Sequence, residues 1–154
     1  MKTSFVVSVF VMLLAVQVLA QKKATSEVEA IKSAIEKETQ AYFSIDQQSW
    51  MDSWVHAPYS YWSYIDESAV NHFEGWNAIE VGFNDYFVTS KPASIAVERE
   101  WQEIRVYGTG AYARFKQYVV ADGVKGPEQT EIRVLEKDKK NAWKIVLVAV
   151  LKKA

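Results

Sequence analysis

The run from Trp143 to Leu151 constrains the fold more than any other stretch, because it is apolar at both sets of alternating positions. One set is Trp143, Ile145, Leu147, Ala149 and Leu151, and the other is Val146, Val148 and Val150. Successive side chains of a β-strand point to opposite faces, so a strand that is apolar on both faces must be covered on both. The run therefore predicts a central strand rather than an edge strand.

Three further strands are predicted before this one, all rich in Val, Ile and Tyr. They are Ser94–Tyr107, Ala111–Ala121 and Thr130–Lys137. Turn residues separate them, namely Gly108–Gly110, Asp122–Gly123 with Gly126–Pro127, and Asp138–Asn141. Together with the last strand they form a predicted four-stranded antiparallel meander.

The preceding part of the chain predicts helices and a hairpin. Ser26–Glu29 fits a capping box, and a helical stripe follows through Val28, Ile31, Ile35, Glu38 and Tyr42. Glu38 has two interpretations: it reaches solvent or a lysine from the edge of the stripe, or it places its carboxylate at a cavity. Asp46 is the predicted N-cap of a second helix, Gln47–Val55. A hairpin of Ser60–Asp66 and Asn71–Gly75 follows, and then a third helix, Trp76–Ser90.

This order predicts an α+β fold, with three helices on one face of a strongly curved, mostly antiparallel sheet. The curvature would leave a pocket between the concave face of the sheet and the helices. At 154 residues the chain suits one domain, which we assign to residues 26–154.

The first twenty residues are predicted to be a secretory signal peptide. Lys2 supplies a positive start, Phe5–Leu19 an apolar run, and Val18–Ala20 a small-residue cleavage site before Gln21. The run has 15 residues, fewer than the roughly 20 that cross a bilayer. We expect a secreted or periplasmic protein that has no membrane attachment after cleavage and begins with a disordered leader, residues 21–25.

Composition excludes several classes of function. Cleavage removes Lys2, so the mature chain is slightly more acidic than the −1 of the whole sequence, which disfavours nucleic-acid binding. The chain has no cysteine, so disulfides and thiolate catalysis are excluded. Aromatic residues make up 14 % of the chain, enough for either a large aromatic core or an aromatic-lined cavity.

Several local features resemble the nuclear transport factor 2-like superfamily, and within it the SnoaL-like, ketosteroid-isomerase-like branch. They are Gln40–Asp46, Trp50–Trp54, Phe73–Ile79, Gly110–Phe115 and Ala142–Ile145, within a match over about residues 27–151. The resemblance implies a cone-shaped α+β barrel with an internal pocket, often dimeric through the open face of its sheet. Its members include isomerases, cyclases, dehydratases and proteins that only bind or associate, so function does not follow from the fold.

The catalytic pattern of ketosteroid isomerases does not carry over. By rough alignment Trp62 falls where the aspartate base stands, Glu38 near the tyrosine and Glu131 near the second acid. His56 and His72 flank the hairpin, and one of them could act as a general base beside a carboxylate. Their spacing does not indicate a metal site, and we predict neither a metal nor a cofactor.

The favoured function is binding of a small, partly apolar molecule in an aromatic-lined pocket. The alternatives are an isomerase, cyclase or dehydratase and a dimeric association module with a filled pocket. The predicted lining is Tyr42, Trp54, Trp62, His72 and Trp101, with Arg114 and Glu131 as polar anchors. Arg114 could instead belong to an outward-facing ladder with neighbouring acids, and Trp62 could serve as a stacking platform or as a plug.

Overall fold

A computed structural model describes residues 25–152 of the chain. The predicted signal peptide and residues 21–24 of the predicted leader lie outside these residues. Within them, the N-terminal helix covers residues 25–43, α2 is Gln47–Asp52 and α3 is Trp76–Thr89. None of these helices is long and apolar enough to cross a membrane.

The helix boundaries differ from the predicted ones mainly at the start of the first helix and at the end of α2. Thr25 and Ser26 are already helical, so Ser26 is not the N-cap. Asp46 is the N-cap of α2, because its Oδ1 accepts the backbone N–H of Ser49 at 3.0 Å. Helix α2 then ends three residues before the predicted Val55.

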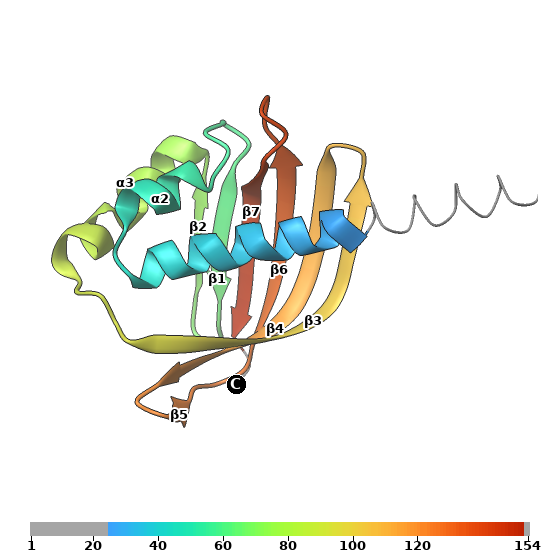
Figure 1. Ribbon diagram of the computed structural model, residues 1–154. Helices are drawn as coiled ribbons and strands as arrows, with labels where there is room; N and C mark the ends of the chain where they lie inside the picture. Colours follow the sequence, from blue (N-terminus) through green and yellow to red (C-terminus); the bar gives the residue numbers. More distant parts are fainter. Residues whose placement is uncertain (1–24, 153–154) are drawn as a thin grey trace, which may run out of the picture.

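One curved sheet contains all strands of residues 25–152. The strands are β1 (Tyr61–Ile65), β2 (Val70–Glu74), β3 (Ile95–Tyr107), β4 (Gly110–Ala121), β5 (Val124–Lys125), β6 (Gln129–Lys137) and β7 (Trp143–Lys152). Their spatial order is β2-β1-β7-β6-β4-β3, with β5 paired to β4 (Figure 1). The meander β3-β4-β6-β7 is antiparallel as predicted, and the short β5 was not anticipated.

Strand β7 is central, between β6 and a parallel β1. The predicted assignment of β7 side chains to two faces is wrong. Val146 of β7 has no partner on β6, and this bulge reverses the alternation of side chains along the rest of the strand. Trp143 and Ile145 therefore share the concave face with Val148 and Val150, all buried. The chain itself does not cover the other face fully, since Leu151 remains 39 % exposed.

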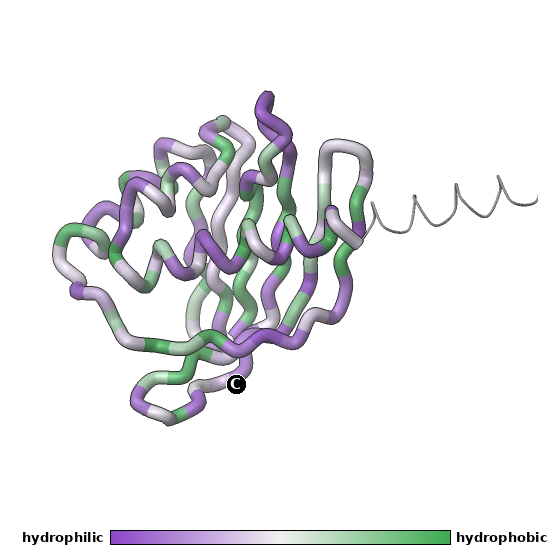
Figure 2. Tube along the Cα trace, viewed as in Figure 1, coloured by the Kyte–Doolittle hydropathy of each residue, from purple (hydrophilic) through white to green (hydrophobic). Residues whose placement is uncertain are grey.

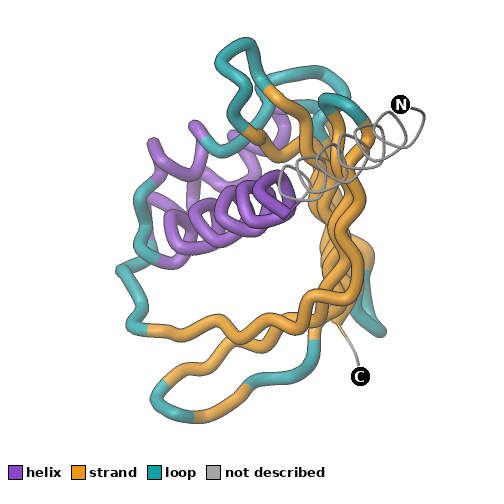
Figure 3. The backbone as a smooth tube through the Cα atoms, turned by 45° about the vertical axis from the view of Figure 1, so that its right-hand side comes forward, coloured by secondary structure: helices purple, strands orange, loops and turns teal. Residues whose placement is uncertain are grey.

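A second bulge occurs in β3, where Gln102 is skipped between Trp101 and Glu103. Bulges bend strands, and the sheet that carries these two is strongly curved (Figure 3). The helices lie on the concave side, and the sheet curves beneath them without closing into a barrel. The predicted α+β class, with three helices against a curved and mostly antiparallel sheet, is confirmed.

The core forms where helices and concave face meet. Ile31 and Ile35 of the first helix are fully buried, as are Phe115 of β4 and Ile145 of β7. Hydrophilic residues gather at the turn between β6 and β7, outside this core (Figure 2). On the convex face, alternation brings together partly buried apolar residues of the three middle strands, namely Ile65, Ile132, Val134, Leu147 and Ala149, with Leu151 more exposed beside them.

Candidate functional site

A cavity of about 300 Å³ lies between the N-terminal helix and the concave face of the sheet. Tyr42, Trp62 and Phe83 contribute aromatic wall, and Val148 and Val150 contribute an apolar floor. Charged and amide side chains line the remainder, and these are Glu38, Gln117, Gln129, Glu131 and Arg133. The predicted pocket therefore exists, and it is more polar than the predicted lining.

Arg133 of β6 holds two carboxylates together inside this cavity. Its Nη1 lies 3.2 Å from Oε2 of Glu38, and its Nη2 lies 2.6 Å from Oε2 of Glu131. All three side chains are at most 7 % exposed. Burial alone would lower the pKa of Arg133, but the adjacent carboxylates of Glu131 and Glu38 raise it above the ordinary value.

Neutral donors complete this ionic cluster. Trp50 Nε1 donates to Oε1 of Glu38 at 2.9 Å, and Gln117 Nε2 donates to Oε1 of Glu131 at 2.7 Å. Arg133 Nε also donates to Oε2 of Glu131, at 2.9 Å. Every oxygen of the two carboxylates therefore accepts at least one hydrogen bond, which offsets the cost of burying the charges.

Each member of the cluster is placed by its secondary structure. Glu38 occupies the helical stripe one turn beyond Ile35, so the face that packs on the sheet carries it inward. Glu131 and Arg133 are two apart on β6 and share its concave face with Leu135. Of the two interpretations of Glu38, the cavity position is correct, and a position at the solvent edge is wrong.

The aromatic wall is a packed assembly. Trp62 stacks on Phe73, with ring centroids 5.5 Å apart, and meets Phe83 edge-on at 4.9 Å. Tyr42 stacks on Tyr86 at 4.3 Å. Burial raises the pKa of Tyr42 above its ordinary value, so its hydroxyl stays protonated at pH values where an exposed tyrosine ionises. Trp62 forms part of the cavity wall and does not fill the cavity. This position favours the interpretation of Trp62 as a surface on which a ligand stacks over that of a side chain that plugs the pocket.

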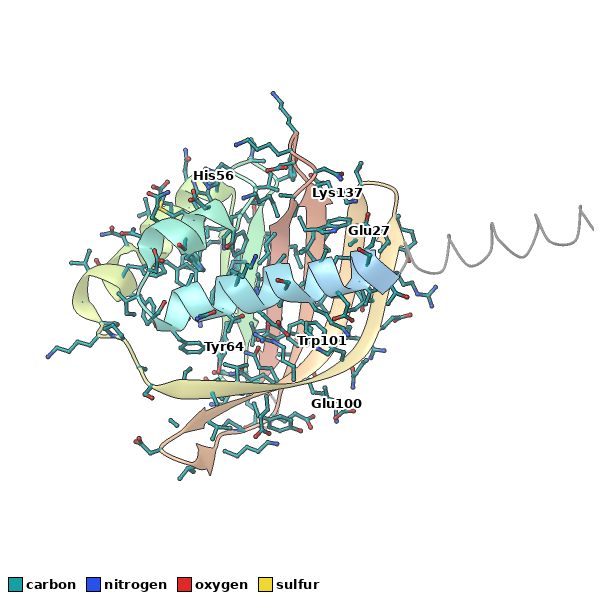
Figure 4. All side chains as sticks on the ribbon, in the orientation of Figure 1. Glu27, His56, Tyr64, Glu100, Trp101 and Lys137 are labelled. Atoms are coloured by element: carbon teal, nitrogen blue, oxygen red, sulfur yellow. The ribbon has the colours of Figure 1, made fainter. Side chains whose placement is uncertain are left out.

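Three of the seven residues predicted from sequence line the cavity: Tyr42, Trp62 and Glu131. Trp54 instead packs in the core against Trp50 and Trp76. Trp101 packs on Phe115, with ring centroids 4.7 Å apart, outside the lining. Tyr64 of β1, labelled in Figure 4, is a lining residue that the sequence analysis missed.

His72 and Arg114 lie on the convex face. The exposed His72 is paired in register with Ser63 and approaches Tyr61, at 6.2 Å between ring centroids. Arg114 Nη2 lies 3.9 Å from Oε2 of Glu103, so the outward ladder is correct and the concave-face clamp does not form. His56, labelled in Figure 4, stacks instead on Trp76, with ring centroids 4.0 Å apart.

Two cavity residues could have been found from sequence. Gln117 shares its alternating set with Ala111, Ala113 and Phe115, and a lone amide in an apolar set marks a polar group facing the interior. Arg133 is two residues from Glu131, which puts opposite charges on one face of a strand. Trp50 gives no such signal, because its partner Glu38 is twelve residues away and belongs to another helix.

A larger depression of about 640 Å³ lies between the N-terminal helix, α2 and residues 141–144. Small and polar side chains dominate its lining, including Ala30, Ser33, Ser49 and Ser53. It lacks the aromatic wall and the buried ions of the cavity, so the cavity is the stronger candidate site.

No family model matches the sequence, and none of the curated proteins does. Solved structures match the fold. A nuclear transport factor 2-like protein with a cystatin-like fold from Novosphingobium aromaticivorans has a TM-score of 0.66 at 16 % identity, over 88 % of this chain and 87 % of that one. A nuclear transport factor 2-like superfamily protein from Salmonella enterica has 0.61 at 21 %, over 84 % and 94 %.

A candidate ketosteroid isomerase from Parabacteroides distasonis has a TM-score of 0.58 at 17 % identity, over 77 % of this chain and 84 % of that one. Identities this low establish similarity of fold and leave chemistry to the site itself.

Proposed function

This chain has the nuclear transport factor 2-like fold, and we propose that it is an exported protein that binds a small, partly apolar molecule. The N-terminal apolar run supports export, and the chemistry of the cavity supports binding. The molecule lies between the aromatic wall of Tyr42 and Trp62 and the ionic cluster around Arg133. Its flat apolar part contacts the rings, and a polar group meets the buried amide and ions.

The observation that carries this proposal is a cavity of about 300 Å³ whose lining combines aromatic rings with buried charged and amide groups. Aromatic rings supply a surface for the apolar part of a ligand, and the polar groups supply its anchors.

An acid–base enzyme is the second candidate, because Glu38 and Glu131 approach one cation at one place. A general base must direct a lone pair at the substrate. Here Arg133, Trp50 and Gln117 already donate to the four carboxylate oxygens. This arrangement supports a role in holding the cavity open and polarised, and it makes binding without chemistry the better proposal.

The third class, an association module with a filled pocket, is disfavoured by the cavity volume. Association itself stays part of the proposal. The apolar stripe on the convex face, Ile132, Val134, Leu147 and Ala149, supports a homodimer through the open side of the sheet.

Binding is tested with a set of uncharged two-ring aromatic compounds, by thermal melting and tryptophan fluorescence. A probe at about one hundred times its Kd should stabilise the fold by about 2.7 kcal/mol. Trp62→Leu should weaken binding by about 1–3 kcal/mol through loss of the stacking surface. Trp101→Leu, a partly buried tryptophan off the cavity, is the matched control and should bind as the wild type does. The proposal would be contradicted if no probe binds, or if the Trp62 variant binds the probes as tightly as the wild type does.

Export is tested separately, by mass spectrometry of the protein recovered from outside the cytoplasm. We expect a mature N-terminus at or near Gln21. Recovery of a chain that still begins at Met1 would contradict export with cleavage.

A further inference from the structure

Arg99 of β3 is a half-buried cation that forms no ion pair with any carboxylate of residues 25–152. Its Nη2 donates to Oγ1 of Thr39 at 2.6 Å. Its Nε is buried and lacks an acceptor, and so does not bond to Oε1 of Gln117, the buried and unpaired oxygen of the residue opposite in the β3–β4 ladder. Nη1 makes no hydrogen bond within residues 25–152 either, but unlike Nε it is not buried. The free and accessible donor of Arg99 is therefore Nη1.

The acids around Arg99 do not fully compensate its charge. Burial lowers the pKa of Arg99 below its ordinary value, and the positive charge of Arg133 lowers it further. The carboxylates of Glu131, Glu38 and Glu36 raise it, but together they raise it less than the other two causes lower it. Arginine keeps its proton in proteins, so a further anion beside the guanidinium would stabilise it.

Arg99 lines a depression of about 370 Å³ between the C-terminal half of the N-terminal helix and the start of β3. This depression adjoins the cavity, with which it shares Thr39 and Phe43. The rest of its lining is mixed, with apolar Ile95 and Val97 and polar Gln40, Ser44 and Ser94. A lining of this kind suits a small molecule that has one charged group and an apolar body.

Two contacts hold the guanidinium of Arg99 in place. Thr39 Oγ1, which accepts from Nη2, itself donates to the backbone oxygen of Ile35 at 3.0 Å. The guanidinium carbon lies 5.4 Å from the centroid of the Phe115 ring, which is a cation–π distance. A guanidinium that is already positioned loses little conformational freedom when it binds an anion.

We propose that this depression is a second binding site, which takes the carboxylate of a small organic acid. A carboxylate oxygen accepts from Nη1 of Arg99, and the apolar part of the acid lies against Phe43 and Ile95. Glu36 lines the same depression, so a single negative charge suits the site better than the double charge of a phosphate. Glu36 is exposed, and solvent weakens its repulsion of the bound acid. This site goes beyond the proposed function and does not depend on it.

The test is calorimetric titration of the mature protein with three probes of similar shape. They are 3-phenylpropanoate, an anion, 3-phenylpropanamide, which is uncharged, and 3-phenylpropylammonium, a cation. Hydrogen bonds to charged groups are the stronger ones, so we expect the anion to bind about tenfold or more tightly than the amide. The cation should bind weakest. Arg99→Gln should abolish the preference for the anion over the amide.

Three other variants serve as controls. Arg105→Gln removes an exposed arginine of the same strand and should leave the preference intact. Trp62→Leu alters the cavity and not the depression, so it should leave the affinity for 3-phenylpropanoate unchanged. Glu36→Gln removes the anion at the depression and should tighten binding of 3-phenylpropanoate by up to about fivefold, with no change for the amide. Because Glu36 is exposed, this variant keeps the test decisive even if Arg99→Gln does not fold.

The inference is overturned if the wild type binds the anion and the amide equally, if none of the three probes binds, or if the cation binds tightest. A preference for the anion that survives in Arg99→Gln, or weaker binding of the anion by Glu36→Gln, also overturns it. Loss of 3-phenylpropanoate binding in Trp62→Leu would place the acid in the cavity and overturn the second site. The uncharged two-ring probes test the cavity alone, so their failure to bind would remove the proposed function and leave this inference standing.

Discussion

Replacing Arg133 with methionine should destabilise this protein strongly, because Arg133 is the cation shared by two buried carboxylates. Its guanidinium reaches Glu38 at 3.2 Å and Glu131 at 2.6 Å, and the three side chains are 6 %, 7 % and 2 % exposed respectively. Removing one partner of a buried ion pair leaves an uncompensated charge and costs about 3–5 kcal/mol. Methionine fills much of the same volume, so the loss is chiefly electrostatic.

Urea unfolding followed by tryptophan fluorescence measures this loss. With a denaturant slope of about 1.5 kcal/mol per M, a loss of about 4 kcal/mol moves the midpoint down by about 2–3 M. The slope should stay unchanged, since the substitution does not alter the surface exposed on unfolding.

Two controls separate charge from packing. The triple variant Glu38→Gln, Glu131→Gln, Arg133→Met removes all three charges together and should recover most of the loss, since neutral replacement of a buried ionic group is far less costly than breaking it. Arg105→Met removes a surface arginine that pairs with Glu103 and should leave the midpoint unchanged. A shift below about 0.5 M for Arg133→Met would refute the reasoning and mean that solvent screens the cluster.

Three further predictions concern packing, titration and assembly. Gly82→Ala should lower the stability measured by thermal unfolding by about 1–3 kcal/mol, because the new Cβ would lie 2.4 Å from Cζ of Phe73. Alanine has the higher helix propensity, so the control Asn84→Ala on the same helix should not destabilise the protein. Burial raises the pKa of Tyr42, so the folded state keeps a proton that the unfolded chain loses near pH 10, and stability should fall as pH rises above that point. Tyr42→Phe should flatten this alkaline slope, and an unchanged slope would contradict the assignment. Light scattering of the mature protein should give twice the chain mass, and Leu147→Glu on the convex face should give the monomer; a wild-type monomer at micromolar concentration would exclude the dimer.

The order and nature of the secondary structure could be predicted from sequence because they depend on local patterns. Turn residues such as Gly108 and Asn141 adopt positive φ, where they end one strand and start the next. Asp46 caps α2 as its position before the helix indicates. The apolar content of Trp143–Leu151 was enough to place β7 in the middle of the sheet, since an edge would leave its side chains exposed.

Only the tertiary structure decided which residues meet in the cavity. Alternation along a strand assumes an unbroken period of two, and the bulge at Val146 changes the phase of β7 halfway, which no residue type there announces. Trp54 and Trp101 carry the same ring as Trp62, and nothing in the sequence distinguishes the three as pocket residues. Packing around α2 and β4 directs the first two elsewhere.

The ionic cluster shows the same limit. Glu38, in the N-terminal helix, is more than ninety residues from Glu131 and Arg133 of β6 along the chain. The helical stripe of residues 28–42 and the alternation along β6 bear on whether each residue is buried. Their pairing depends on how the N-terminal helix lies across β6, and that angle follows from the whole packed core. The sequence by itself determined the fold class, and of the polar residues that face inward it identified Glu131 and left Glu38 open. The distances that join those residues into one cluster around an unpaired amide oxygen arise only when the helix and the curved sheet pack together.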